Sequence, residues 1–427
     1  MRGAVLRSRQ LLVLSVFCLL GVSLKPLCAA DWPQWRGPER TGVAPDGVPL
    51  ANAWPKTGPK LVWQVDNLPG GRSTGFGSPV IANGRVYLYR NWPATDAPPG
   101  NRDSLICLDA GTGALIWQKI FPVAKVNEAD QGGTPCVTGG KLYVVGTRCL
   151  LCLDAGTGDL VWKTQIPNTD IHGYCDLASS PLVVDGVVVV VAAGFRGFDA
   201  RTGELRWVND EQPRTWGDYT SMAPWIKDGK TYVVGERYDY RCFDPLTGTL
   251  IWKVGGVRCG GGSWWGNSTP VIIGDLMISN PVNGGLECDQ LTMTGPKQLW
   301  NVPHHDVSTA PLVYQGYVYT IGGGDYGHQT TMKCIELQTG DVCWEIKTPG
   351  QGCSSPIAVD GNILGYMNFG KVLVMMKATP DACTQLAYLP MQGDGYSSPA
   401  FADGKIVMRT RTGLICYDLT AAANPGK

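Results

Sequence analysis

The 427-residue chain lacks an excess of charge, because 36 Lys and Arg balance 36 Asp and Glu, and it has only 4 His. Charged residues make up 17% of the chain and hydrophobic residues 44%, whereas a disordered chain would have more charge and fewer apolar residues. A net charge of zero also disfavours binding to a phosphate backbone, which needs clustered Lys and Arg. We therefore expect a folded protein without a nucleic-acid partner.

Long apolar runs are also lacking, since no later segment approaches the roughly 18 residues of a transmembrane helix. The apolar run 11–24 follows Arg2, Arg7 and Arg9 and precedes small residues at 28–30. This pattern predicts a signal peptide at 1–30. Its removal leaves 32 basic and 36 acidic residues, a net charge of −4. We expect a periplasmic or secreted protein, monomeric and without a transmembrane segment.

Known catalytic signatures are missing from the sequence. There is no Gly-x-Ser-x-Gly elbow, no His-Glu-x-x-His and no phosphate-binding loop. The sequence therefore names no catalytic residue, and its organisation has to be read from its repeats.

A phrase of an acidic residue, Thr-Gly and Trp recurs along the chain, as in DAGTGALIW at 109–117 and DAGTGDLVW at 154–162. Trp117, Trp162, Trp207 and Trp252 are 45 residues apart, and two further copies follow at intervals of 48 and 44 residues. A second phrase, mostly opened by Ser-Pro or Thr-Pro, recurs eight times, beginning at 78, 134, 180, 223, 269, 310, 355 and 398. An all-β repeat of this length predicts propeller blades of four strands.

The two ends of the repeat region complement each other. The last unit, 397–418, has no Trp strand, whereas the segment 60–65 is a Trp strand without a unit before it. If 60–65 completes the eighth blade, the ring closes and exposed sheet edges are reduced. The seventh unit is a weak copy, with Gln-Leu-Ala at 385–387 in place of the Trp ending.

We therefore predict an all-β protein, an eight-bladed β-propeller of four-stranded antiparallel blades, with the eighth blade closed by an N-terminal strand. The predicted divisions are a signal peptide at 1–30, a leader segment at 31–59, the propeller at 60–420 and a C-terminal tail at 421–427.

The repeated phrase resembles the tryptophan-docking repeat of pyrroloquinoline quinone (PQQ) dehydrogenases, in which Trp docks between neighbouring blades. The resemblance covers residues 60–420 and extends to the non-enzymatic assembly proteins of the BamB type. The leader Asp-Trp-Pro-Gln-Trp-Arg-Gly-Pro at 31–38 resembles the start of PQQ-like repeat proteins of planctomycete-type bacteria. The resemblance implies a fold and leaves the chemistry open.

Cysteine is common, with 13 residues after the signal peptide, but its placement indicates packing. Cys107, Cys152, Cys242, Cys288, Cys334 and Cys416 stand at one equivalent place in six blades. Free Cys packs as a small buried hydrophobe. The Cys-x-x-Cys at 149–152 has an odd spacing, which in a strand places the two thiols on opposite faces.

The long irregular segments between blades all fall on one face of the predicted ring, and binding residues concentrate in such loops. Our candidates for binding a cofactor or partner there are Trp264, Trp265, Asn267, Arg258 and Asp306. His304, His305 and His328 are weak candidates for a metal site, and no metal is expected. Further residues on this face are His172, Arg72, Asp176, Arg214, Trp216, Asp218, Tyr219, Cys259, Asp325, Asp394 and Tyr396.

A classical PQQ dehydrogenase would need calcium ligands, a carboxylate base and a quinone sandwich. The resemblance implies a vicinal disulfide over the quinone, yet the chain has no Cys-Cys pair. The stretch 303–309 lacks the Trp-Asp of the family, and the strand 314–321 lacks the expected Asp.

Three functions stay open, and a non-enzyme is favoured. The first is an exported scaffold that binds a protein partner, in envelope assembly, through the loop-rich face. The second is a divergent PQQ-dependent oxidoreductase with PQQ and Ca²⁺ near Trp264 and Trp265. The third is a carbohydrate-binding propeller, since Trp and Tyr share this face with Asp and Asn.

Overall fold

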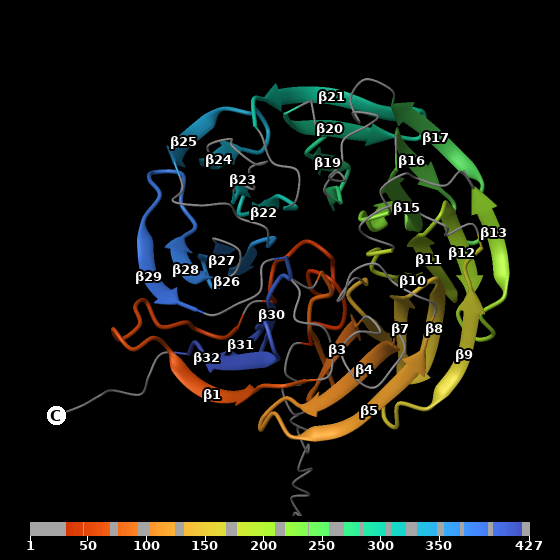
Figure 1. The fold of residues 1–427 in the computed structure, drawn as a ribbon. Helices are drawn as coiled ribbons and strands as arrows, with labels where there is room; N and C mark the ends of the chain where they lie inside the picture. Colours follow the sequence, from red (N-terminus) through yellow and green to blue (C-terminus); the bar gives the residue numbers. More distant parts are fainter. Residues whose placement is uncertain are drawn as a thin grey trace, which may run out of the picture.

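The computed structural model describes residues 31–45, 47–68, 76–92, 102–123, 132–167, 177–209, 218–237, 239–255, 269–281, 285–304, 309–321, 331–347, 354–367, 371–391 and 396–420. Within these ranges every regular element is a strand, and the strands form eight four-stranded sheets. The sheets stand around a central axis like the blades of a propeller (Figure 1). The predicted fold class is confirmed.

Each blade runs from a short inner strand to an outer edge strand. Blade 1 comprises β2 (Val80–Ala82), β3 (Arg85–Trp92), β4 (Arg102–Asp109) and β5 (Leu115–Pro122), and blade 2 comprises β6 (Cys136–Thr138), β7 (Lys141–Gly146), β8 (Cys149–Asp154) and β9 (Leu160–Gln165). Blade 3 comprises β10 (Leu182–Val184), β11 (Val187–Val191), β12 (Phe195–Asp199) and β13 (Leu205–Asn209), and blade 4 comprises β14 (Ala223–Lys227), β15 (Lys230–Glu236), β16 (Asp239–Phe243) and β17 (Leu250–Gly255). Blade 5 comprises β18 (Val271–Ile273), β19 (Leu276–Ser279), β20 (Leu286–Thr292) and β21 (Gly295–Val302), and blade 6 comprises β22 (Leu312–Tyr314), β23 (Tyr317–Thr320), β24 (Thr331–Glu336) and β25 (Val342–Lys347). Blade 7 comprises β26 (Ile357–Val359), β27 (Asn362–Met367), β28 (Val372–Lys377) and β29 (Gln385–Pro390), and blade 8 comprises β30 (Ala400–Ala402), β31 (Lys405–Arg409), β32 (Leu414–Asp418) and β1 (Lys60–Val65). The outer strand of blade 8 thus comes from the other end of the propeller sequence, since β1 pairs antiparallel with β32.

The strand order gives the ring two different faces. Tight turns join the inner strand of each blade to the second strand, and Asn83 and Gly84 in blade 1 both have positive φ, 52° and 71°, as a type I′ hairpin requires. Turns between the third and fourth strands lie on the same side, which we call the turn face. The links between blades and between second and third strands lie on the opposite side, which we call the loop face.

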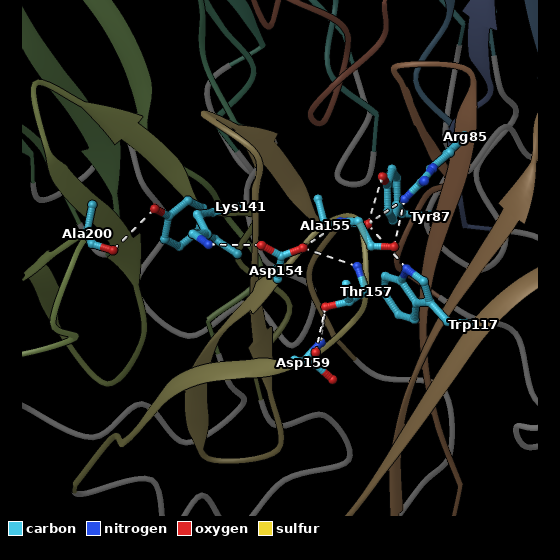
Figure 2. Close-up of polar contacts among 11 residues, drawn as sticks. Arg85, Tyr87, Trp117, Lys141, Asp154, Ala155, Thr157, Asp159 and Ala200 are labelled. Carbon is cyan, nitrogen blue, oxygen red and sulfur yellow. Dashed lines mark hydrogen bonds and ion pairs between the residues drawn. The ribbon is translucent and has the colours of Figure 1, made fainter.

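Neighbouring blades are joined by the repeated Trp. In blade 1, Trp117 Nε1 donates a hydrogen bond of 3.2 Å to the carbonyl of Ala155 in blade 2, and Arg85 and Tyr87 donate to the same carbonyl (Figure 2). The indole also covers Gly158, whose φ is +74° and where an added Cβ would lie 2.7 Å from the ring. The same bond from Trp Nε1 to the next blade is made by Trp63, Trp162, Trp207, Trp300 and Trp344.

The repeated Cys has a packing role that depends on this Trp. Cys107 lies directly opposite Trp117 in the strand register, and the other five repeat cysteines lie opposite a docking Trp in the same way. In blade 7, where Ala387 replaces the Trp, the opposite residue is the larger Met375. Met375 thus fills part of the volume that the indole would occupy, and the complete burial of the six repeat cysteines indicates a packing role.

Burial keeps the repeat thiols protonated. It raises the pKa of Cys107 and Cys152 to about 11, and that of Cys242 to about 12. Cys149 and Cys152 belong to different core clusters, one toward blade 1 and one toward blade 3, so the predicted opposite orientation is confirmed.

The seam between blades 4 and 5 departs from the rule. Trp252 Nε1 has no hydrogen-bond partner among the described residues, because the receiving turn of blade 5 is replaced by a ladder that continues to Thr292 and Gly295. Asp275 of blade 5 links the two blades instead, since its carboxylate accepts from Trp225 Nε1 at 3.0 Å and from the Lys227 ammonium at 2.7 Å. The longer ladder also accounts for the 48-residue interval before Trp300.

A ring of hydroxyls ties the inner strands together at the loop-face end of the channel. The backbone amide of Ser78 donates to Thr134 Oγ1 at 3.0 Å, and the backbone amide of Thr134 donates to Ser180 Oγ at 3.0 Å. The same amide-to-hydroxyl bond continues from Ser180 to Ser221 and from Ser221 to Thr269. It resumes from Ala310 through Ser355 and Ser398 back to Ser78. Only the bond from Thr269 to blade 6 is missing, because Ala310 has no hydroxyl. The Ser-Pro and Thr-Pro openers of the repeat supply most of these hydroxyls.

The first part of the leader, 31–45, closes the other end of the channel, on the turn face, and lies inside the ring (Figure 1). Trp32 exchanges two backbone hydrogen bonds with Ile81 of blade 1, and the carbonyl of Pro33 accepts from Val137 of blade 2. Further along, Ala44 N donates to Ala358 O of blade 7 at 2.8 Å. The leader thus behaves as an extended segment that binds the inner strands.

The leader also supplies contacts that join blades 7 and 8. Blade 8 has no turn between its third and fourth strands, because β1 comes from elsewhere in the sequence. Leu50 N donates to Asp360 Oδ2 at 2.8 Å, Ala51 N donates to the carbonyl of Leu419, and Trp54 packs on the core cluster there. A Trp in the outer strand of blade 7 would dock on that turn of blade 8. Because the turn is absent, blade 7 has Ala387 at the position of the docking Trp.

We predict that Trp162→Ala lowers the free energy of unfolding by about 3–5 kcal/mol, because it removes a buried aromatic and its bond to Ala200. Leu160→Ala is the matched control on the same strand, since Leu160 is 46% exposed, and it should change stability by less than about 1 kcal/mol. Denaturant unfolding followed by Trp fluorescence measures both. Equal losses would contradict the docking role.

We predict that Ala310→Ser stabilises the protein by about 1 kcal/mol, because the new hydroxyl can accept from the Thr269 amide and complete the ring. No described residue accepts from that amide at present. Melting temperature measures the gain, with Ala310→Val as a control that adds volume without an acceptor. A Ser variant no more stable than the Val variant would show that the ring does not strengthen the fold.

Candidate binding site at the loop-face mouth of the channel

Three aromatic side chains from distant blades meet at the loop-face end of the channel. The ring of Phe76 lies 6.4 Å from that of Tyr219, nearly parallel, and 5.0 Å from that of Tyr396. The three residues precede blades 1, 4 and 8. Because blade 4 stands across the ring from blade 8, their contact spans the channel. We call this group the aromatic cluster, and each of its side chains is half-buried.

The cluster follows from the hydroxyl ring. Phe76, Tyr219 and Tyr396 each stand two residues before a ring hydroxyl, those of Ser78, Ser221 and Ser398. The inner strands therefore hold the three rings at one level above the hydroxyls. Offset aromatic contacts of this kind gain about 0.5–1.5 kcal/mol beyond burial and leave a rigid apolar floor.

Buried charges gather at the same end of the blades. The buried charged residues of the propeller all stand near the loop-face ends of their strands or in the loops there, and they are Arg90, Asp103, Arg196, Asp218, Glu236, Arg237, Asp239, Arg241, Glu287, Asp289, Lys333 and Arg409. The turn face instead carries exposed ion pairs such as Lys119 with Asp159. The buried charges of the blades therefore lie beneath the loop face, whereas on the turn-face side the leader contributes two further buried charges, Arg36 and Arg40.

Asp218 connects this charged layer to the aromatic cluster. Its Oδ1 accepts from Arg237 Nε at 2.9 Å, with both side chains fully buried, and its Oδ2 accepts from the Ala193 amide at 2.7 Å. Its neighbour in sequence is Tyr219. A carboxylate with these partners fixes blade 3 to blade 4 directly beneath one of the three rings.

Asp103 forms a second buried node, between blades 1 and 2. It accepts hydrogen bonds from the hydroxyls of Tyr89 and Thr147, both at 2.7 Å, and from the Thr147 amide. Burial raises the pKa of Asp103, although these hydrogen bonds oppose the shift. Burial and the neighbouring carboxylate also raise the pKa of Tyr89 well above its usual value, so that the phenol stays a donor.

Most candidates from the sequence cannot be placed in this geometry. Trp264, Trp265, Asn267, Arg258 and Asp306 lie outside the described residues, as do His305 and His328. The same holds for several further loop-face candidates, namely His172, Arg72, Asp176, Arg214, Trp216, Cys259, Asp325 and Asp394. Asn267 stands two residues before Thr269, the place in sequence that the cluster aromatics occupy in their own blades. Across the described ranges, no group of three or more His, Cys, Asp and Glu is arranged to hold a metal ion.

Two of the loop-face residues expected from the sequence, Tyr219 and Tyr396, do converge, and Asp218 lies beside them. Sequence reasoning missed Phe76 and Arg237. A signal for Phe76 was present, since an aromatic residue stands two positions before the Ser that opens the repeated phrase in blades 1 and 8. No comparable signal marks Arg237, which is identified only by its buried partner.

Among the residues that the structure describes, no helix is long and apolar enough to cross a bilayer.

A family model described as outer membrane protein assembly factor BamB matches residues 101–256. Among solved structures, BamB from Moraxella catarrhalis superposes with a TM-score of 0.58 at 14% identity, covering 82% of this chain and 98% of that one. The repeat, the eight sheets and this match agree. The chain is an eight-bladed propeller, and its residues 101–256 resemble the BamB family model.

Enzymes share the architecture of this PQQ-like propeller. A quinohemoprotein alcohol dehydrogenase from Comamonas testosteroni superposes with a TM-score of 0.65 at 15% identity, covering 93% of this chain and 82% of that one. A europium-containing methanol dehydrogenase gives 0.64 at 12% identity, with 90% of each chain covered. At these identities the likeness establishes the fold alone.

Curated relatives match only in part. The beta-alanine-activating enzyme of Danio rerio is 29% identical over 126 residues, which is 28% of this chain and 10% of that protein. The tetrathionate hydrolase of Acidithiobacillus ferrooxidans is 23% identical over 223 residues, 50% of this chain and 34% of that protein. The matches span 10% and 34% of the two relatives, so neither activity carries over.

We predict that Asp218→Ala costs about 3–5 kcal/mol of stability, because it removes the fully buried carboxylate that pairs with the Arg237 guanidinium. The matched control is Lys119→Ala, which breaks an exposed ion pair and should cost at most about 1 kcal/mol. Thermal unfolding of both variants measures the difference. A small loss for Asp218→Ala would mean that the buried pair does not hold the seam.

Proposed function

We propose that this PQQ-like propeller is an exported binding or scaffold protein of the cell envelope and that it binds a protein partner through its loop face. The observation that supports this most is the aromatic cluster, which stands at the axis above a hydroxyl ring and beside the Asp218–Arg237 pair. Aromatic anchors held rigidly near a desolvated charge pair are typical of the energetic centres of protein interfaces.

The proposed location is the periplasm or the exterior, after cleavage of residues 1–30. It is supported by the basic and apolar pattern of that segment and by the description of the matching family as an outer membrane assembly factor. We expect the mature chain to be a monomer, with Trp264 and Trp265 contributing to the same loop-face site.

The alternative is a divergent PQQ-dependent oxidoreductase. The flat faces of Phe76, Tyr219 and Tyr396 favour a planar ligand at the axis, and dehydrogenases are among the structural neighbours. The described residues supply such a floor but no cluster of ligands for Ca²⁺, so calcium binding would depend on Asn267 and Asp306, and Arg258 would contact the quinone rather than the metal. When bound, PQQ would supply the redox chemistry, and these residues would bind and orient it.

A photo-crosslinking experiment tests the proposal. A benzoylphenylalanine in place of Tyr396 should cross-link a discrete envelope protein in the native cells. The same probe in place of Tyr388, which is 51% exposed on the outer strand of blade 7, should not. Trp265→Ala should remove the cross-link while leaving the melting temperature nearly unchanged.

Titration of the purified mature chain with PQQ, with and without Ca²⁺, distinguishes the scaffold proposal from the oxidoreductase alternative. Calcium-dependent binding that raises the melting temperature, together with no cross-link at Tyr396, would replace the scaffold proposal with the oxidoreductase. A melting temperature lowered by Trp265→Ala as much as by Trp162→Ala would show that Trp265 is a core residue and that this part of the site is wrong.

A further inference from the structure

The turn face contains a groove that the leader leaves open. It has a volume of about 770 Å³, within the roughly 300–1,000 Å³ range of ligand-binding clefts. One wall is the leader, from Pro38 to Pro45, and the other is the turn-face ends of the inner strands of blades 4, 5 and 6. The blade wall is formed by Pro224, Ile226, Ile272, Ile273, Gly274, Tyr314 and Gln315.

The leader itself shows how this surface binds a peptide. In blades 1, 2 and 7 the middle residue of the inner strand, at Ile81, Val137 and Ala358, donates its amide to a leader carbonyl. The carbonyls of Trp32 and Pro33 accept from blades 1 and 2, respectively. Consecutive residues of an extended chain that runs around the channel can therefore bind the amides of consecutive blades.

Blades 4, 5 and 6 present the same backbone position without a partner. The strand register makes Ile226, Ile272 and Val313 the counterparts of Ile81, because each is one residue before the pair that closes the hairpin. That position points its amide and carbonyl away from the second strand and toward the channel. Among the described residues none pairs with these three backbones.

The side chains that line the groove indicate what kind of ligand would fit it. Ile226 is 63% exposed, which is unusual for a large apolar residue beside a cavity. Glu39, on the leader wall, is exposed, and it is the charged residue of the lining. A ligand matched to this surface has an extended backbone, apolar side chains and one cationic side chain near Glu39.

We propose that this groove binds an extended apolar peptide segment of another protein, whose backbone carbonyls accept from the amides of Ile226 and Ile272 and whose basic residue faces Glu39. The segment would continue the interface that the leader already makes with blades 1, 2 and 7, by the strand-addition mode of peptide recognition. The groove lies on the opposite face from the aromatic cluster and is a separate site.

The probe is a fluorescein-labelled, N-acetylated heptapeptide, Val-Thr-Val-Lys-Val-Thr-Val, whose β-branched residues favour an extended backbone. Fluorescence anisotropy with the full mature chain should show saturable binding. Ile226→Asp should weaken it at least tenfold, since it places a charge in the apolar wall, and Ile116→Asp, at a 42% exposed site on the outer strand of blade 1, should leave it unchanged.

Charge reversal gives a second readout. The heptapeptide with Glu in place of Lys should bind the wild-type chain more weakly, and Glu39→Lys should reverse this order. No saturable binding up to about 1 mM, which corresponds to about −4 kcal/mol, or equal affinity in wild type and Ile226→Asp, would overturn the proposal. Peptide binding should persist in Trp265→Ala, so failure at the loop face and failure at this groove are distinguishable.

Discussion

The hydrogen bond from a Trp indole to the carbonyl of the next blade is the contact on which the propeller depends. It requires a small residue beneath the ring, which is Cys in six blades and Gly197 in blade 3, where a Cβ would lie 2.2 Å from Trp207. In five seams the ring also covers a glycine in the turn, as at Gly158, whereas the turn that receives Trp344 has none. The interval between Trp and Cys, the Thr-Gly turn and the 45-residue period are therefore consequences of one packing geometry.

Where that geometry fails, the chain supplies another joint. Blade 5 lacks the receiving turn, and Asp275 holds Trp225 and Lys227 instead. Blade 8 lacks the turn because the ring is opened there, and the leader fills the gap with Leu50 and Trp54. Both exceptions are visible in the sequence, as a longer interval and as Ala387, yet only the structure identifies their replacements, because these come from residues distant in the chain.

The fold was predictable because its signals are local and repeated, whereas the candidate site was not. Tyr219 and Tyr396 could be assigned to the loop face from strand order alone, but their contact with Phe76 depends on closure of the whole ring. The leader shows the same limit, since a Pro- and Gly-containing segment has no periodicity from which pairing with Ile81 and Ala358 could be inferred. A tertiary contact between segments that occur once in the chain has no repeated sequence pattern from which it could be predicted.

The seams between blades and the ends of the channel are built from different residues. Stability is carried by indoles at the outer strands and by hydroxyls at the inner strands, so residues at either mouth of the channel can change without loss of the ring. Buried charges such as Asp218 and Arg237 are costly unless paired, and among the blades they are concentrated beneath the loop face. On the turn-face side the buried charges Arg36 and Arg40 belong to the leader, and Arg40 donates to the carbonyls of Ser180 and Pro181. The blades thus supply buried charge at one end of the channel, and the leader supplies it at the other.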